Sequence, residues 1–193
     1  MNTVFQYDNY LLKRQVLALT GKLRFYNPAD DLVLFVHQKM FRLREDIRVY
    51  TDEQKTQEVL LIKAKNIIDW AASYDVTDSA TGQKIGVLRR KGWKSMLRDE
   101  WEVLDSNDQF IGRLFEDSAW QAVLRRLVLG SLLPQNYDLT IGDVRVADLR
   151  QKFTLLGYQM NLDFSMDTTR KLDHRLGIAA ATLLAIIEGK QQS

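Results

Sequence analysis

The segment Leu176–Ile187, which reads LGIAAATLLAII, constrains the fold more than any other part of the chain. From Ile178 onward apolar residues occupy every face of a helix, and such a helix must be surrounded by protein or by lipid. A helix of this length extends about 18 Å, whereas a membrane hydrocarbon core is about 30 Å thick. The sequence therefore predicts a buried core helix that begins near Thr168 or Thr169 and ends at Gly189. A tail-anchored membrane protein is the alternative.

Composition removes several functional classes. The chain of 193 residues contains no cysteine, which excludes a disulfide framework, a Cys-ligated metal and a thiol nucleophile. Its two histidines, His37 and His174, have no sequence-local partners that indicate catalysis or metal binding, so we expect a structural role or exposure to solvent for each. A net charge of +2 lacks the basic excess of a nucleic-acid-binding protein. We expect no nucleic-acid partner, no cofactor, no metal site and no catalytic residues.

Most of the chain from Tyr10 to about Gln159 has the pattern of a sheet. Short β-branched and aromatic runs alternate with turn signals such as Asn27–Asp31, at intervals of about ten residues. This spacing is typical of a sandwich or a barrel. No Pro-, Gly- or Ser-rich linker interrupts the pattern, so we predict a single domain over residues 1–193. The expected strands are 12–19, 23–26, 32–36, 47–50, 59–64 and 67–76.

Two segments, Tyr74–Leu88 and Trp101–Leu114, repeat one pattern: a strand, an Asp-Ser turn, and a second strand that contains Ile-Gly. Each segment predicts a hairpin whose glycine allows a bend or a close backbone approach. Chance similarity between two hairpins is the alternative explanation. A separate amphipathic helix is expected near 118–129, because Ser118 and Gln121 have capping-box spacing and apolar residues follow at helical intervals.

Many short strands and one helix that is apolar on all sides together predict a mostly β fold. The natural surround for such a helix is a closed β-sheet, with the buried C-terminal helix as its axis. The segments Asp75–Arg90, Leu162–Ser165 and Leu172–Ile187 give the chain a resemblance to the superfamily of tubby C-terminal domains, phospholipid scramblases and LURP-one-related proteins. The resemblance extends from about Leu11 to Glu188. It implies a closed antiparallel β-barrel of about twelve strands around the buried C-terminal helix, in a bacterial-type LURP-one-related protein.

The chain also departs from its scramblase-like relatives. It lacks their Pro-rich N-terminal region and their cysteine cluster for acylation. The segment that corresponds to their calcium site, Asn161–Asp167, carries two carboxylates, whereas a calcium ion takes about six to eight oxygen ligands. We therefore do not expect calcium-driven lipid scrambling. Tubby-like members bind phosphoinositide headgroups through Lys and Arg, a property that transfers only where a basic cluster exists.

Such a cluster exists between Ala80 and Arg98, a stretch without any acidic residue. Grouped Lys and Arg side chains hold phosphates, and a tryptophan among them can lie at the headgroup level of a bilayer. The alternative is a solvated hairpin whose charges pair with Asp99, Glu100 and Glu102. The candidate headgroup ligands are Lys84, Arg89, Arg90, Lys91, Lys94 and Arg98, and the candidate membrane contact is Trp93.

Two further motifs are interpreted as structural. Asp105–Glu116 superficially resembles a calcium loop, but its sixth residue is Phe110 instead of glycine and its flanks are strand-like, so we expect a turn. Gly82–Gly86 lacks the following Gly-Lys-Ser/Thr of a phosphate loop.

The sequence thus favours a non-enzymatic module that binds anionic phospholipid headgroups, or a partner, through a basic hairpin. The alternatives are a protein-interaction domain without lipid affinity and an enzyme whose carboxylates only the fold brings together. The N-terminal residues do not have the pattern of a signal peptide, so we expect a cytoplasmic protein that can be peripheral to the membrane.

Overall fold

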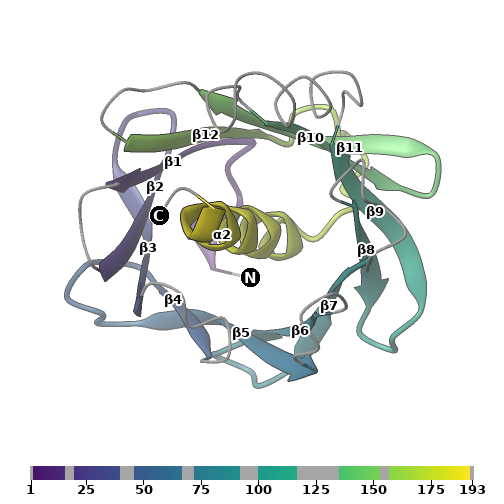
Figure 1. Cartoon of the computed structure of the whole chain (residues 1–193), viewed down its shortest axis with the longest axis horizontal. Coiled ribbons are helices and arrows are strands. Elements are labelled where there is room, and N and C mark those ends of the chain that lie inside the picture. The colour runs from purple at the N-terminus through teal and green to yellow at the C-terminus, as the bar shows by residue number, and fades with distance from the viewer. Residues whose placement is uncertain are drawn as a thin grey trace.

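The computed structural model describes residues 2–15, 20–39, 46–66, 72–91, 100–116, 135–152 and 157–191. In these residues, twelve antiparallel strands form a closed barrel in which each strand pairs with its neighbours in the chain (Figure 1). Pairing between the first and last strands closes the wall, with Leu12 opposite Met160 and Arg14 opposite Tyr158. Full closure leaves no strand edge unpaired around the wall.

The strands are short, and their side chains alternate between the barrel interior and the outer surface. A short 3-10 helix, η1 (Thr3–Phe5), precedes them. The strands are β1 (Asn9–Gln15), β2 (Thr20–Tyr26), β3 (Leu32–Lys39), β4 (Ile47–Tyr50), β5 (Glu58–Asn66), β6 (Ser73–Asp78), β7 (Lys84–Arg90), β8 (Glu100–Asp105), β9 (Phe110–Glu116), β10 (Asn136–Ile141), β11 (Val144–Lys152) and β12 (Gly157–Asp163).

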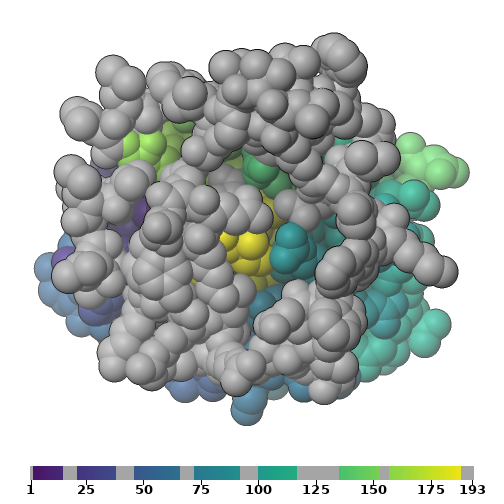
Figure 2. Space-filling view, viewed as in Figure 1, coloured from purple at the N-terminus to yellow at the C-terminus, as the bar shows by residue number. Residues whose placement is uncertain are grey.

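Helix α2 (His174–Gln191) lies inside the barrel, surrounded by the strands (Figure 1). Every residue from Leu176 to Ile187 is buried, and atoms of the helix are visible at the centre of the face in Figure 2. Thr182 is buried among them and donates its hydroxyl hydrogen to the carbonyl oxygen of Ile178 at 2.8 Å. This arrangement confirms the predicted barrel around a hydrophobic C-terminal helix. Within the described residues, no helix combines the length and apolar character needed to cross a lipid bilayer.

The helix begins at His174, later than the predicted start near Thr168 or Thr169. The Asp167 carboxylate accepts backbone N–H groups of Lys171 and Leu172 at 2.9 and 2.8 Å, which holds this segment in a turn. Arg170 has a φ of 52°, which is incompatible with a right-handed helix. Asp173 then caps the helix by accepting the backbone N–H of Arg175 at 3.0 Å.

The repeated hairpins are confirmed as β6–β7 and β8–β9. Their glycines meet the predicted requirement for close approach. A Cβ atom on Gly86 would collide with the carbonyl oxygen of Leu104 in β8, and one on Gly112 would collide with that of Thr140 in β10. The predicted strand 67–76 corresponds to β6, which begins at Ser73. The amphipathic helix expected near 118–129 lies outside the described residues.

Candidate functional site

Four of the predicted headgroup ligands lie on or next to strand β7. Arg89 is exposed and Arg90 is half-buried. Alternation along the strand turns Arg90 to the side of the core residue Leu88, and therefore away from Arg89 and Lys91. Burial raises the pKa of Tyr74 to about 12, an effect that the positive charge of Arg90 partly opposes. Trp93, Lys94 and Arg98 lie outside the described residues.

The outward cations at one end of β7 pair with carboxylates of β8. The Arg89 guanidinium donates to Glu102 at 2.6 Å. Lys91 pairs with Glu100 at 2.9 Å and with Glu102 at 3.7 Å. Arg113 of β9 also approaches Glu100, at 4.0 Å. The predicted pairing with Glu100 and Glu102 is therefore present, but each carboxylate is shared by two cations.

Lys84 lies at the other end of β7 and joins the two repeated hairpins. Its Nζ is 2.7 Å from Asp108 in the β8–β9 turn and 3.5 Å from Asp75 in β6. Partial burial opposes protonation of Lys84, but the hydrogen bonds and negative charges of Asp108 and Asp75 together outweigh it and raise the pKa of Lys84. Asp108 is in turn shared with Lys65 at 3.5 Å.

These contacts define an outer surface over β5–β9 that we call the basic face. Its five cations contact four carboxylates, so a net positive charge of one remains after every contact is made. The side chains of Arg89, Lys91 and Arg113 are 48%, 42% and 53% exposed, and therefore accessible to a ligand in solvent. The basic face consists of Lys65, Lys84, Arg89, Lys91 and Arg113 with Asp75, Glu100, Glu102 and Asp108.

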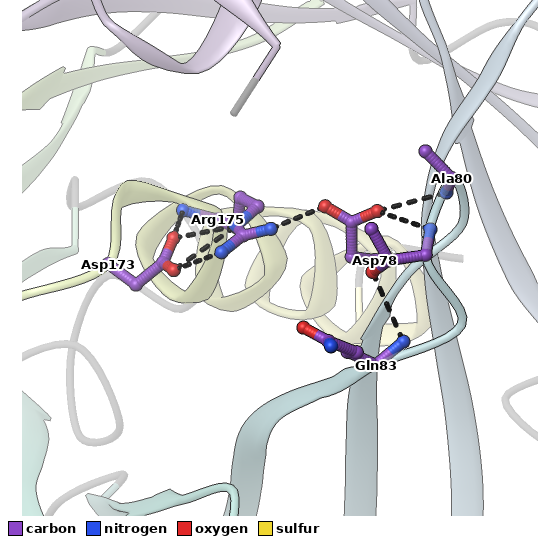
Figure 3. Close-up of polar contacts among 6 residues, drawn as sticks. Asp78, Ala80, Gln83, Asp173 and Arg175 are labelled. Atoms are coloured by element: carbon purple, nitrogen blue, oxygen red, sulfur yellow. Dashed lines mark hydrogen bonds and ion pairs between the residues drawn. The ribbon is translucent and has the colours of Figure 1, made fainter.

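The hairpin that carries β7 is fixed to the start of helix α2 (Figure 3). Asp78 closes its own turn by accepting the backbone N–H groups of Ala80 and Thr81 at 2.9 and 3.0 Å. Its second oxygen accepts a hydrogen bond from Arg175 at 2.5 Å, and Arg175 also pairs with Asp173. Burial opposes ionisation of Asp78, but these N–H groups and the Arg175 charge together lower its pKa. The basic hairpin is thus attached to the central helix through an ion pair that lies largely away from solvent.

His174 occupies the first turn of α2 and is buried. Its ring stacks on Phe164 with centroids 4.3 Å apart. Nδ1 lies 3.1 Å from the carbonyl oxygen of Phe5, and Nε2 lies 2.8 Å from the guanidinium of Arg170. Burial lowers the pKa of His174, and the nearby charge of Arg170 lowers it further. A neutral ring that donates to Phe5 and accepts from Arg170 satisfies both contacts, so His174 joins the N-terminal segment to the helix start.

The carboxylates at the position of the scramblase calcium segment make local contacts. Asp163 accepts the backbone N–H of Ser165 at 2.8 Å, while Asp167 holds the turn before α2. Within the part of the chain that the structure describes, no group of three or more His, Asp or Glu residues could hold a metal ion. The calcium-like segment at Asp105 is a turn between strands, as predicted.

The match to known families agrees with the architecture. The family model described as LURP-one-related matches residues 32–185, which is more than half of the chain. No curated protein and no solved structure matches the chain significantly. The matched residues include strands β3 to β12 and most of the enclosed helix. The chain belongs to the LURP-one-related family.

Proposed function

We propose that the chain is a non-enzymatic, single-domain barrel module that binds anionic phospholipid headgroups through its basic face at the cytoplasmic surface of a membrane. The observation that carries the proposal is the sharing of Glu100, Glu102 and Asp108, each between two cations. A bound anion would supply the negative charge that neutralises the remaining positive charge of the basic face. Trp93, Lys94 and Arg98 belong to the proposal on the strength of the sequence alone.

The energies involved allow exchange between carboxylates and headgroups. Exposed ion pairs contribute about 0–1 kcal/mol each, and a basic residue near an anionic membrane gains about 1 kcal/mol. A phosphate can therefore replace a surface carboxylate at little net cost, and an arginine such as Arg89 can bind it through two parallel N–H groups. Because both terms are screened by salt, binding should weaken steeply as ionic strength rises.

Liposome flotation tests this function. Wild-type protein should float with vesicles that contain phosphatidylserine or phosphoinositide, but not with neutral phosphatidylcholine vesicles. The double variant Arg89→Glu and Lys91→Glu should bind at least about tenfold more weakly, because two attractive charges become repulsive. The matched control, Arg145→Glu with Lys152→Glu, changes the charge equally on β11 and should bind like wild type. Unchanged binding of the first variant would remove the proposal.

The second candidate is a protein-interaction domain without lipid affinity. It is favoured by the exposed apolar side chains of Phe110 and Val144, which are 52% and 43% exposed. They lie at the starts of β9 and β11, the two strands that flank β10. Failure of the wild-type protein to float with any anionic vesicle would favour this second function.

A further inference from the structure

A second group of basic side chains lies on another part of the barrel wall. Lys22 of β2 and His37 of β3 are opposite each other in the strand register. Lys55, from the turn between β4 and β5, places its Nζ 3.0 Å from Nδ1 of His37. Three strand-and-turn segments thus bring three nitrogen-bearing side chains to one outer position.

These cations differ from those of the basic face in their partners. Among the described residues, neither Lys22 nor Lys55 forms an ion pair with a carboxylate. Two acids lie in the turn that carries Lys55. Glu53 is held by two nitrogens of Arg24 at 2.7 and 3.3 Å, and the Lys22 charge also acts on it. The Asp52 carboxylate accepts hydrogen bonds from Thr51 and Thr56. The charges of Lys55 and Lys22 add to burial in lowering the pKa of His37, so both lysines act directly on this ring.

The group is held in place by the turn and by aromatic rings. Lys55 has a φ of 61°, and its backbone N–H donates to the carbonyl oxygen of Asp52 at 3.1 Å. Its Nζ lies 5.8 Å from the ring centroid of Tyr50. The ring of His37 lies 6.3 Å from that of Phe35, which is 2% exposed. A ligand would therefore meet positions that are already ordered, which reduces the entropic cost of binding.

We propose that Lys22, His37 and Lys55 form a binding site for a phosphomonoester dianion. The two ammonium groups donate to phosphate oxygens. When Nδ1 of His37 accepts from Lys55, the ring proton is on Nε2, so the imidazole also presents an N–H donor. The site uses no residue of the basic face and goes beyond the function proposed above. The phosphomonoester can belong to a lipid headgroup or to a small soluble molecule.

Because the chain has only two histidines, imidazole NMR signals test the site directly. Titration of the full chain with inorganic phosphate, at constant ionic strength maintained with chloride, should shift the His37 signal saturably. The His174 signal should not move, because that ring is buried at the start of α2. Equal shifts in chloride alone, or no saturable shift, would overturn the proposal.

Variants assign the effect to the named side chains. Lys22→Gln with Lys55→Gln should weaken phosphate binding at least tenfold, whereas the matched control Lys63→Gln with Lys152→Gln should bind like wild type. An unchanged His174 signal verifies that each variant is folded. If the double variant does not fold, the single variant Lys55→Gln, in the exposed turn, replaces it in the phosphate titration. Retention of full phosphate binding by the double or single variant would contradict the proposal.

Two further arms distinguish the source of the phosphate and separate this site from the basic face. If the Lys22/Lys55 variant also loses flotation with phosphatidic acid vesicles, the ligand is a lipid headgroup; if flotation is unchanged, it is a soluble phosphomonoester. The Arg89/Lys91 variant should retain the His37 shift in either case. Loss of the His37 shift in the Arg89/Lys91 variant would refute a separate site. Failure of the wild-type protein to float would remove only the function proposed for the basic face.

Discussion

The two repeated hairpins begin their turns with the same kind of aspartate contact, but the β6–β7 turn, closed from Asp78 to Gln83, is one residue longer than the β8–β9 turn, closed from Asp105 to Gln109, and the two have different neighbours. In β6–β7, Asp78 accepts the N–H groups of two following residues, and in β8–β9, Asp105 does the same toward Asn107 and Gln109 at 2.8 and 2.9 Å. Of the contacts described for the two aspartates, one from Asp78 extends to the central helix, through Arg175. A local turn motif can thus acquire a long-range role through one additional partner.

The glycines of the two hairpins differ in a similar way. A Cβ on Gly112 would meet the backbone of Thr140 together with the side chain of Ile141. A Cβ on Gly86 would meet one carbonyl oxygen, and also the side-chain tips of Leu176 at 3.2 Å. In the β8–β9 hairpin, the atoms nearest to a Cβ on Gly112 therefore belong to the barrel wall. In the β6–β7 hairpin, those nearest to a Cβ on Gly86 belong to both the wall and the central helix.

The largest expected effect is that of alanine at these glycines. Gly112→Ala should reduce the free energy of unfolding by about 3 kcal/mol, because backbone atoms of a paired strand must move. Gly86→Ala should cost about 2 kcal/mol, because its Cβ would overlap one backbone atom, the Leu104 carbonyl oxygen, less closely than a Cβ on Gly112 overlaps Thr140, and because the tips of Leu176 can adjust in part. Urea unfolding measures both. A smaller loss for Gly112→Ala than for Gly86→Ala would contradict this order.

The next effect separates the two aspartates. Asp105→Ala should cost about 1 kcal/mol by releasing the N–H groups of its turn. Asp78→Ala should cost about 2–3 kcal/mol, since it also removes a carboxylate partner of the largely buried Arg175, which keeps its pair with Asp173.

A double-mutant cycle isolates the additional partner. The losses caused by Asp78→Ala and Arg175→Ala should be non-additive by about 1 kcal/mol or more, because the two side chains are in contact. The cycle of Asp105→Ala with Arg175→Ala should be additive. Equal coupling in the two cycles would show that the contact with the helix does not distinguish the hairpins.

Acid offers a way to weaken the helix start without changing either hairpin. Because the pKa of His174 is lowered in the folded chain, the unfolded chain binds more protons once the pH falls below about 6.5. The stability from its neutral ring is fully present above that value and is lost as the pH falls through the folded pKa. Urea midpoints should decrease from about pH 7.5 to about pH 5.5. The decrease should be smaller in His174→Asn; an identical pH dependence would argue against this role.

The smallest effect is expected where the hairpins touch at the surface. Asp108→Asn removes the ion pairs with Lys84 and Lys65. Exposed pairs of this kind contribute little, so the urea midpoint should remain within measurement error of the wild-type value. A clear decrease would mean that the surface pair couples the hairpins as strongly as the helix contact does.

The sequence predicted the features that depend on local pattern. Apolar residues on all sides of Leu176–Ile187 required an enclosed helix, and the Asp-Ser turns with Ile-Gly predicted two hairpins. The helix start was predicted too early, because the polar residues from Thr168 are compatible with a first turn. A side-chain contact from Asp167, which no periodicity reveals, holds them outside the helix.

Contacts between distant residues explain most of the remainder. The pair of Asp78 with Arg175 depends on how the closed barrel encloses the helix, so turn chemistry alone does not predict it. Lys22 and His37 are nearer to prediction: symmetry about the turn at Asn27–Asp31 would pair Lys22 with Val36, and the register shift between Phe25 and Tyr26 moves the pairing by one residue to His37. The position of Lys55 beside His37 depends on the next turn along the barrel, which strand spacing does not specify.

The enclosed helix also has a consequence for how the chain folds. Helix α2 follows all twelve strands in the chain yet lies inside the wall that they form. A wall that closed first would exclude the helix, so we expect the last strand pairing to form after the helix has docked on an open sheet. The pairing of β1 with β12 joins the strands most distant in the chain, so we expect it to form late. Until then the surface that lines the barrel is exposed, which favours slow folding and aggregation of incomplete chains. A ribosome-bound chain that lacks only its last segment has twelve strands and no core to close around.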